Sequence, residues 1–227
     1  MTLQHVDMLF ELIAFLLAIS VHESAHAWMA NRLGDPTARM LGRVSLNPIK
    51  HIDLVGTIIL PAVALFAHIP MLGWAKPTPV NPQNFKNQVL DDILTSVVGP
   101  LSNFFLASIA LFGLALVKFS SPLGAQIVFG IPQGFIDAGT KSALLPLCLL
   151  LYELMVINVV LGVFNLIPVP PLDGSHVLRH FLPASTLRIY DTVGGFALLA
   201  LVFLGGGILG RLIYPVLGIF NSILARI

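Results

Sequence analysis

Charged residues are scarce in this chain. Only 10% of its 227 residues are charged, 56% are hydrophobic, and the mean hydropathy is +0.91. A soluble domain carries about 25% charged residues, so much of this protein's surface must face a lipid bilayer. The formal net charge of +1 provides no basic field, which argues against a nucleic-acid partner. The single cysteine, Cys148, excludes both a disulfide framework and a zinc site built from cysteines.

Long apolar runs are what the sequence has in abundance. A transmembrane helix needs about 20 predominantly apolar residues. Three runs meet this length, and a fourth is long enough for two crossings, or for one crossing plus an interfacial helix. These runs are residues 8–30, 91–118, 141–167 and 189–224. We predict an all-α polytopic membrane protein with about five to six transmembrane helices, folded as a single integral-membrane domain over residues 1–227.

The motif His22-Glu23-Ser24-Ala25-His26 lies inside the first apolar run. Ionisable groups at membrane depth are costly and are usually retained for function. On a helix, residues four apart share one face and lie about 6 Å apart along the axis, so both imidazoles can bind one Zn²⁺. Glu23 then lies beside the metal as a candidate general base rather than a ligand.

A catalytic zinc usually has three protein ligands and one open position. Asp173 is the best third ligand, because the proline-rich stretch before it is stiff enough to aim its carboxylate inward. Asp173 could instead cap the helix that follows, since Asp is a favoured N-cap residue. His176 is a competing third ligand, although a place beside the site or at the interface suits it better.

The positions of His26 and Asp173 constrain the topology. His26 lies near the end of the first predicted helix and Asp173 just after the fourth, so an even number of crossings should separate them. The apolar segment 54–72 between them is short and contains Pro61, and a full crossing there would make the number odd. We therefore predict that this segment re-enters and returns through the proline-rich loop of residues 73–82. Non-helical backbone is tolerated at this depth where it is buried in protein.

The densest group of basic residues follows the first apolar run. It comprises Arg32, Arg39, Arg43 and Lys50. Short loops rich in lysine and arginine stay in the cytoplasm. We therefore expect the active site to lie nearer the cytoplasmic face of a multi-pass cell-membrane protein.

Three stretches together resemble the site-2 protease family of intramembrane zinc metalloproteases. They are HESAHA at 22–27, GPLSN at 99–103 and NLIPVPPLDG at 165–174. The loop GWAKPTPVNP at 73–82 is similar to that of a compact prokaryotic branch of the family. Because the sequence is short and begins almost at the HExxH helix, we expect no PDZ or CBS domain of the kind that larger relatives carry.

The resemblance implies a chemistry for these residues. It implies Zn²⁺ bound by His22, His26 and Asp173, with Glu23 as the acid and base and Asn165 stabilising the oxyanion. It also implies transmembrane protein substrates, cut within or near their membrane segments, and a prokaryotic inner-membrane location.

The loop of residues 73–82 has two interpretations. Trp74, Lys76, Pro77 and Asn81 could contact the substrate or form a gate beside the zinc, with an extended substrate adding to the loop as a strand. The loop could equally be a rigid plug between helices, and Lys76 could simply extend to the membrane interface.

Two polar residues inside the apolar runs have no single interpretation. Asn103 could form a hydrogen bond near the zinc, or it could join two helices. Glu153 is costly at membrane depth, and we assign it no role.

Two other functions fit part of the pattern. A metal-ion transporter could use intramembrane His and Asp side chains, but transporters often show internal repeats, which this sequence lacks. A catalytically silent relative could bind membrane proteins only. The complete set of ligands and a base argues against it, and Glu23 between the two histidines suits hydrolysis better than transport.

Overall fold

The computed structural model describes residues 3–60, 62–63, 73–135 and 142–227, and these residues contain helices but no strands. The main helices are α1 (Leu3–Leu33), α2 (Thr37–Met40), α4 (Gln88–Ser120), α5 (Pro122–Gly130), α6 (Leu144–Asn165), α7 (Asp173–Arg179), α8 (Ala184–Leu204) and α9 (Gly206–Arg226). Short 3₁₀ turns form at Pro48–Lys50, Pro82–Asn84 and Ile131–Gln133, and a π-helical turn forms at Leu54–Ile59. The prediction of an all-α fold is confirmed.

Five of the described helices are long and apolar enough to cross a membrane. They are Met8–Leu33, Gln88–Ser120, Leu144–Asn165, Ala184–Val202 and Gly207–Arg226. The protein is therefore a polytopic membrane protein. The last apolar run of the sequence forms two membrane-length helices, α8 and α9, which meet at Gly205.

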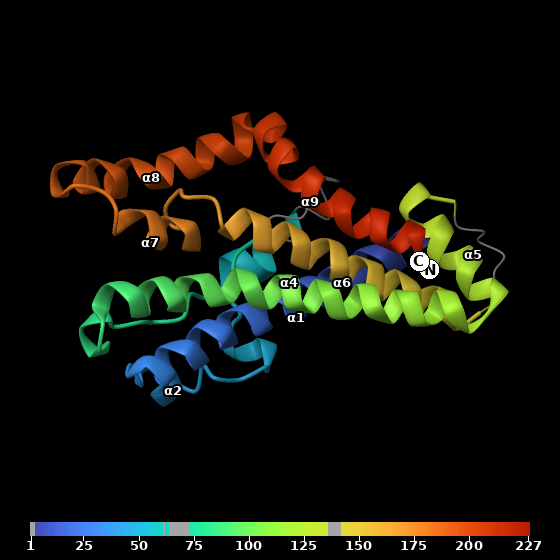
Figure 1. Cartoon of the computed structure of the whole chain (residues 1–227), viewed down its shortest axis with the longest axis horizontal. Helices are drawn as coiled ribbons and strands as arrows, with labels where there is room; N and C mark the ends of the chain where they lie inside the picture. The colour runs from blue at the N-terminus through green and yellow to red at the C-terminus, as the bar shows by residue number, and fades with distance from the viewer. Residues whose placement is uncertain (1–2, 61, 64–72, 136–141) are drawn as a thin grey trace.

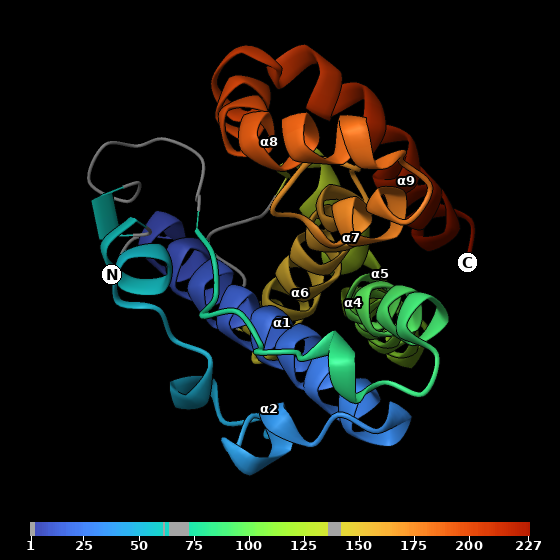
Figure 2. The ribbon, with the colours of Figure 1, turned by 90° about the vertical axis from the view of Figure 1, so that its left-hand side faces the viewer.

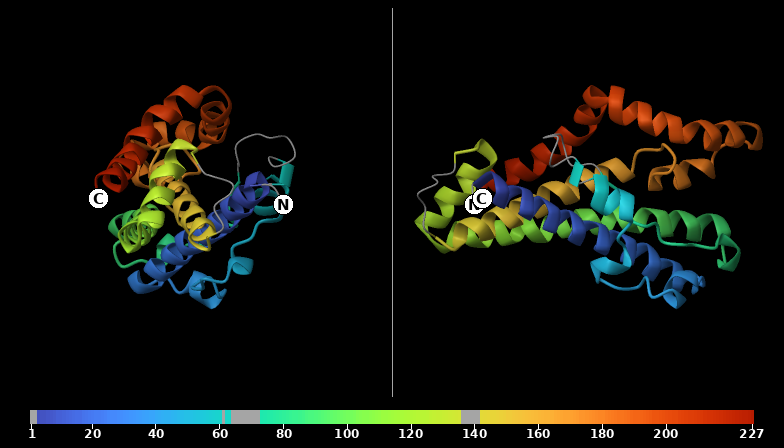
Figure 3. Two further views of the ribbon diagram at one scale, coloured as in Figure 1. Left: turned by 90° about the vertical axis from the view of Figure 1, so that its right-hand side faces the viewer. Right: turned by 180° about the vertical axis from the view of Figure 1, so that it is seen from behind.

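The centre of the molecule is a bundle of α1, α4 and α6 (Figure 1). Small side chains let these helices approach closely, which is the usual basis of helix packing in membranes. Ala14 and Ala18 of α1 and Ala107 and Ala110 of α4 are fully buried. Helix α9 packs on α6, whereas α8 contacts chiefly α9 and diverges from the bundle (Figure 3).

The course of the chain places His26 of α1 and Asp173 of α7 at the same end of the bundle. In Figure 1 the chain runs leftward along α1, returns along α4 and runs leftward again along α6. Among the described residues, only α4 and α6 between His26 and Asp173 are long enough to cross a membrane. This even number matches the topological expectation. Residues 61 and 64–72, on which re-entry of the segment 54–72 depends, lie outside the described residues.

Polar contacts at the C-terminal end of α7 and in the segment that precedes it fix this short helix against its neighbours. At its C-terminal end, His180 Nε2 lies 2.8 Å from Asp92 Oδ2 of α4. Arg179 forms an ion pair of 3.1 Å with Asp191 of α8. The Tyr190 hydroxyl of α8 donates to the carbonyl oxygen of Pro168 at 3.0 Å, in the segment that leads from α6 into α7. These contacts set the position of the helix that begins at Asp173.

Candidate active site

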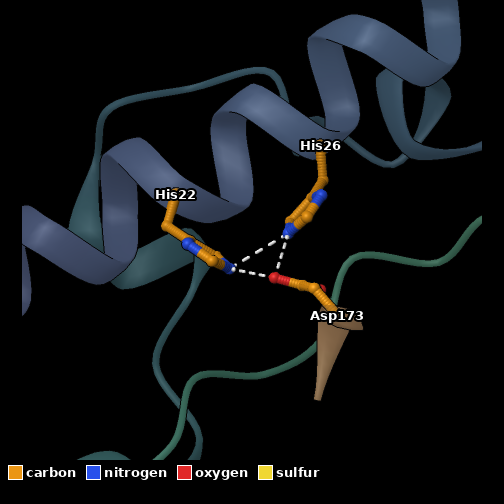
Figure 4. Close-up of side chains that lie close together, drawn as sticks. All are labelled: His22, His26 and Asp173. Carbon is orange, nitrogen blue, oxygen red and sulfur yellow. Dashed lines mark hydrogen bonds and ion pairs between the residues drawn. The ribbon is translucent and has the colours of Figure 1, made fainter. Parts of the chain in front are cut away.

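Three side chains from two distant segments converge at one point. His22 and His26 project from one face of α1, and Asp173 projects from the first residue of α7 (Figure 4). The two Nε2 atoms are 3.0 Å apart. Oδ2 of Asp173 lies 3.1 Å from Nε2 of His22 and 3.3 Å from Nε2 of His26. Each histidine is only 7% exposed.

The protonation of both histidines follows from their hydrogen bonds. Nδ1 of His26 lies 2.6 Å from the carbonyl oxygen of Thr95, which can only accept, so Nδ1 carries a proton. Nδ1 of His22 lies 2.6 Å from Oδ1 of Asn103. The Asn103 amide is oriented in turn, because its Nδ2 donates to Oδ1 of Asn158 at 2.8 Å. With Nδ1 protonated on both neutral rings, both Nε2 atoms present lone pairs to the site.

This arrangement fits a bound cation. Two nitrogen lone pairs and a carboxylate oxygen face one another, and Oδ2 of Asp173 is buried without a hydrogen-bond partner. Such a cluster of acceptors is repulsive unless a positive charge lies among them. Tetrahedral zinc with ligands at about 2.0–2.1 Å separates neighbouring ligand atoms by roughly 3.3–3.4 Å. The observed separations of 3.0 to 3.3 Å are close to that spacing.

The electrostatics of Asp173 point the same way. Burial alone would raise the pKa of its carboxyl group. When protons rather than a metal ion occupy the site, the charge on His26 and hydrogen bonds from the two Nε2 atoms outweigh burial and hold the pKa of Asp173 below its ordinary value. Asp173 therefore stays anionic and attracts positive charge, which either a proton on His26 or a metal ion can supply.

Helix α4 approaches the site at Gly99. A Cβ atom at this position would lie 2.3 Å from Nε2 of His26 and 2.7 Å from Cε1 of His22. Only glycine leaves room for both imidazole rings here. Gly99 thus forms one wall of the site.

Glu23 lies beside this group, and Thr78 holds it. The backbone N–H of Thr78 donates to Oε2 of Glu23 at 2.8 Å, and the Thr78 hydroxyl donates to the same oxygen at 2.7 Å. Thr78 belongs to the segment 73–81, which has no helix or strand and passes along α1 (Figure 2). The segment therefore covers the helix face that carries the candidate base.

The other predicted ligand and oxyanion residues make no described contact with the metal group. His176 lies in the last turn of α7 and is not part of the group formed by His22, His26 and Asp173. Asn165 is the last residue of α6, and its Nδ2 donates to the carbonyl oxygen of Leu161 at 3.1 Å. The described contacts do not join Asn165 to the metal group.

Hydrogen bonds hold the backbone of the first residues of the loop 73–82 in place. The N–H of Trp74 donates to Gly56 at 3.2 Å, and its carbonyl oxygen accepts from the Thr57 hydroxyl at 2.8 Å. The N–H of Lys76 donates to the carbonyl oxygen of His51 at 2.8 Å. The side chains of Trp74 and Lys76 remain exposed.

The later loop residues are fastened in the same way. Arg43 donates to the carbonyl oxygen of Pro77 at 3.3 Å. The N–H of Asn81 donates to Oδ2 of Asp35 at 2.7 Å. A substrate or gate role for Trp74, Lys76, Pro77 and Asn81 stays a prediction, and the structure adds that their backbone is held along its length.

Asn103 combines both interpretations offered by the sequence. It contacts His22, and it joins α4 to α6 through Asn158. Asn158, Thr78 and the carbonyl of Thr95 were not singled out from the sequence, and Arg43 was noted there only as one of the basic residues after the first apolar run. Asn158 carries a signal that could have found it, since a lone amide in an apolar helix needs a partner.

The fold and the site together define a class. A polytopic membrane protein holds an HExxH helix, a distant aspartate and an adjacent glutamate in the arrangement of a zinc metallopeptidase. Residues 10–204 match the model of peptidase family M50, the family of the site-2 proteases, and the chain belongs to this family.

Similar proteins carry names that agree with the family. The chain is 39% identical over 172 residues to "Putative zinc metalloprotease YwhC" of Bacillus subtilis (strain 168), covering 75% of this chain and 68% of that protein. It is 26% identical over 202 residues to "Putative zinc metalloprotease Rip2" of Mycobacterium tuberculosis (strain ATCC 25618 / H37Rv), covering 84% of this chain and 64% of that protein. The chain thus spans about two thirds of the length of these relatives. No solved structure matches it.

Proposed function

We propose that this protein is an intramembrane zinc endopeptidase that hydrolyses peptide bonds within or near the transmembrane segments of other membrane proteins. The observation that carries the proposal is the convergence of His22, His26 and Asp173 beside Glu23, between helices of membrane-spanning length. Membership of peptidase family M50 supports the same conclusion.

Each of the proposed site residues has a separate role in hydrolysis. His22, His26 and Asp173 would hold Zn²⁺, which supplies Lewis-acid chemistry and lowers the pKa of a bound water towards about 7. Glu23 accepts the proton of the attacking water and delivers it to the leaving amine. Oε2 of Glu23 is occupied by Thr78, so Oε1 is the oxygen that exchanges this proton.

Asn165 is proposed to donate its side-chain amide to the developing oxyanion. In the structure this amide donates to Leu161 within its own helix. To act on a substrate, Nδ2 must exchange the Leu161 oxygen for the substrate oxygen, which a side-chain rotation at the end of α6 allows. Such a donor contributes most where charge develops in the transition state.

Transmembrane protein substrates must reach this site from the bilayer. We propose that the segment 73–81 guides or gates them, because it is extended and passes beside Glu23. A substrate helix has to unwind before its peptide bond is exposed, and an extended segment can receive the unwound chain as an added strand. The basic residues that follow α1 favour a cell-membrane location with the site nearer the cytoplasmic face.

A proteomic comparison tests the function. Membranes containing wild-type protein should accumulate cleaved fragments of single-span or multi-span proteins, and membranes containing Glu23→Gln should not. Glu11→Gln is the matched control, because Glu11 lies on the same helix but outside the metal group. Equal fragment patterns for wild type and Glu23→Gln would rule out the proposed chemistry.

A further inference from the structure

We propose that Thr78 is a positioning residue for the base Glu23, and that Arg43 fastens the segment that carries Thr78. This inference rests on the proposed peptidase function and adds to it two residues outside the HExxH motif and the metal ligands. Thr78 is 55 residues from Glu23 in sequence, so only the fold brings them together.

Thr78 contacts only one of the two carboxylate oxygens of Glu23. Oε2 of Glu23 accepts two hydrogen bonds from Thr78, one from the backbone N–H and one from the hydroxyl. The hydroxyl also lies 3.0 Å from the backbone oxygen of Glu23, but it has one hydrogen, and the shorter distance of 2.7 Å directs it to the carboxylate. Among the described residues Oε1 has no hydrogen-bond partner. One oxygen is therefore held while the other is left for the reacting water.

A glutamate side chain needs such restraint to act as a base. It loses rotamer entropy when it is fixed in one orientation, so an unrestrained Glu23 would spend much of its time misaligned. Hydrogen bonds to a charged acceptor are the stronger kind, and two donors on one oxygen fix the plane of the carboxylate. The alignment of Glu23 is thereby prepared before the substrate binds.

Arg43 holds the backbone immediately before Thr78. Its side chain is buried at 6% exposure, and its guanidinium donates to the carbonyl oxygens of Lys76 at 3.4 Å and Pro77 at 3.3 Å. It also donates to the carbonyl oxygen of Lys50. In the part of the chain that the structure describes, Arg43 forms no ion pair with a carboxylate. A rigid fork of donors suits several carbonyl oxygens at once, and the single ammonium of lysine cannot replace it.

The contact between Thr78 and Glu23 acts on the chemical step. Neither Thr78 nor Arg43 belongs to the metal group. Loss of base alignment weakens an interaction that matters in the transition state, so kcat should fall while KM and zinc content stay the same. A merely structural loss would disturb zinc content or KM as well.

The test uses the full-length, zinc-loaded protein in detergent with fluorescein-labelled casein as the probe. Casein is unfolded, so cleavage needs no unwinding of a substrate helix. Thr78→Val preserves the shape and the N–H but removes the hydroxyl, and kcat should fall about tenfold with KM within about twofold of wild type. Thr78→Ser restores a hydroxyl and should retain most of the activity. Arg43→Lys should lower kcat in the same direction as Thr78→Val.

Thr192→Val is the matched control, because its hydroxyl donates only to Arg188 within α8. It should behave as wild type. Full activity of Thr78→Val would overturn the inference, as would loss of zinc or a rise in KM without a fall in kcat. Equal loss in Thr78→Ser and Thr78→Val would overturn it too, since the hydroxyl would then be irrelevant. If wild type itself leaves casein and membrane proteins uncut, the proposed function fails and this inference fails with it.

Discussion

Nδ2 of Asn103 on α4 donates to Oδ1 of Asn158 on α6 at 2.8 Å, and both side chains are fully buried. Asn158 in turn donates from its own Nδ2 to the carbonyl oxygen of Leu154 at 2.8 Å. This chain of donors fixes the orientation of the Asn103 amide, so Oδ1 is the atom that faces His22. Asn158 does not touch the metal group, but through Asn103 it directs the Nε2 lone pair of His22 into the site.

Removal of the Asn158 amide should weaken zinc binding. Asn158→Leu leaves Nδ2 of Asn103 with only the carbonyl oxygen of Ala18, at 3.4 Å, as its acceptor. The weakly held amide can then rotate, and a rotated amide would present Nδ2 rather than Oδ1 to His22. Partners of this kind typically change metal affinity 10–100-fold, and we expect about tenfold weaker zinc binding because Asn103 itself remains. Competition with a fluorescent zinc chelator measures this. Ser108→Ala on the exposed side of α4 is the control. Unchanged affinity in Asn158→Leu would show that Asn103 keeps its orientation without it.

Measurements of zinc content should distinguish the three proposed ligands, His22, His26 and Asp173, from the base Glu23. Purified wild type is expected to hold about one zinc per chain. His22→Ala and Asp173→Ala each remove a ligand atom and should lower this content strongly. Glu23→Gln and His176→Ala should retain it, because neither residue belongs to the metal group. Loss of zinc in His176→Ala, with retention in Asp173→Ala, would assign the third ligand to His176 instead.

The sequence predicted those parts of the site that follow from chain geometry. The spacing of His22 and His26 places both on one helix face wherever that helix lies. The even number of crossings requires Asp173 to return to their end of the bundle. Helices of membrane-spanning length follow from apolar runs because the bilayer sets the length.

The rest depends on contacts that leave little trace in the residue types. Thr95 contributes its backbone carbonyl, which every residue has, so its side chain gives no signal. Thr78 meets Glu23 through a loop whose path is set by Arg43 and by backbone contacts. Gly99 is informative only when the distance between α1 and α4 is known.

Gly99 offers a direct test of that helix approach. The added methyl of Gly99→Ala would overlap the imidazole of His26, so α1 and α4 must separate or the ring must turn. Overpacking of this kind costs about 1–3 kcal/mol, and here the displaced ring is also a proposed zinc ligand. We expect a lower unfolding temperature and reduced zinc content, read by thermal unfolding and metal analysis. Gly195→Ala on α8 is the control, since its Cβ would meet nothing within 4 Å. Equal behaviour of the two variants would contradict the close approach of α4.

The last prediction concerns Asp35, which fastens the far end of the loop. Its carboxylate is fully buried. Oδ2 accepts from the N–H of Asn81 at 2.7 Å, and Oδ1 accepts from Nδ2 of Asn84 at 2.7 Å and from the N–H and hydroxyl of Thr37 at 3.1 and 2.5 Å. Burial alone would raise the pKa of Asp35, but these hydrogen bonds outweigh burial and lower the pKa below its ordinary value of 3.8.

A lowered folded-state pKa determines the sign of the pH effect. The stabilisation from Asp35 is fully present above the unfolded-state pKa and is lost as the pH falls through the lower folded-state pKa. Asp35→Asn should therefore lower the free energy of unfolding by about 1–3 kcal/mol at neutral pH. The difference from wild type should shrink as the pH falls below the ordinary Asp range. Thermal unfolding in detergent over a pH series measures both effects. Asp191→Asn, which breaks an exposed ion pair with Arg179, should change stability by less than about 1 kcal/mol at every pH. A difference between Asp35→Asn and wild type that persists undiminished into acid would show that the charge of Asp35 is not what holds the loop.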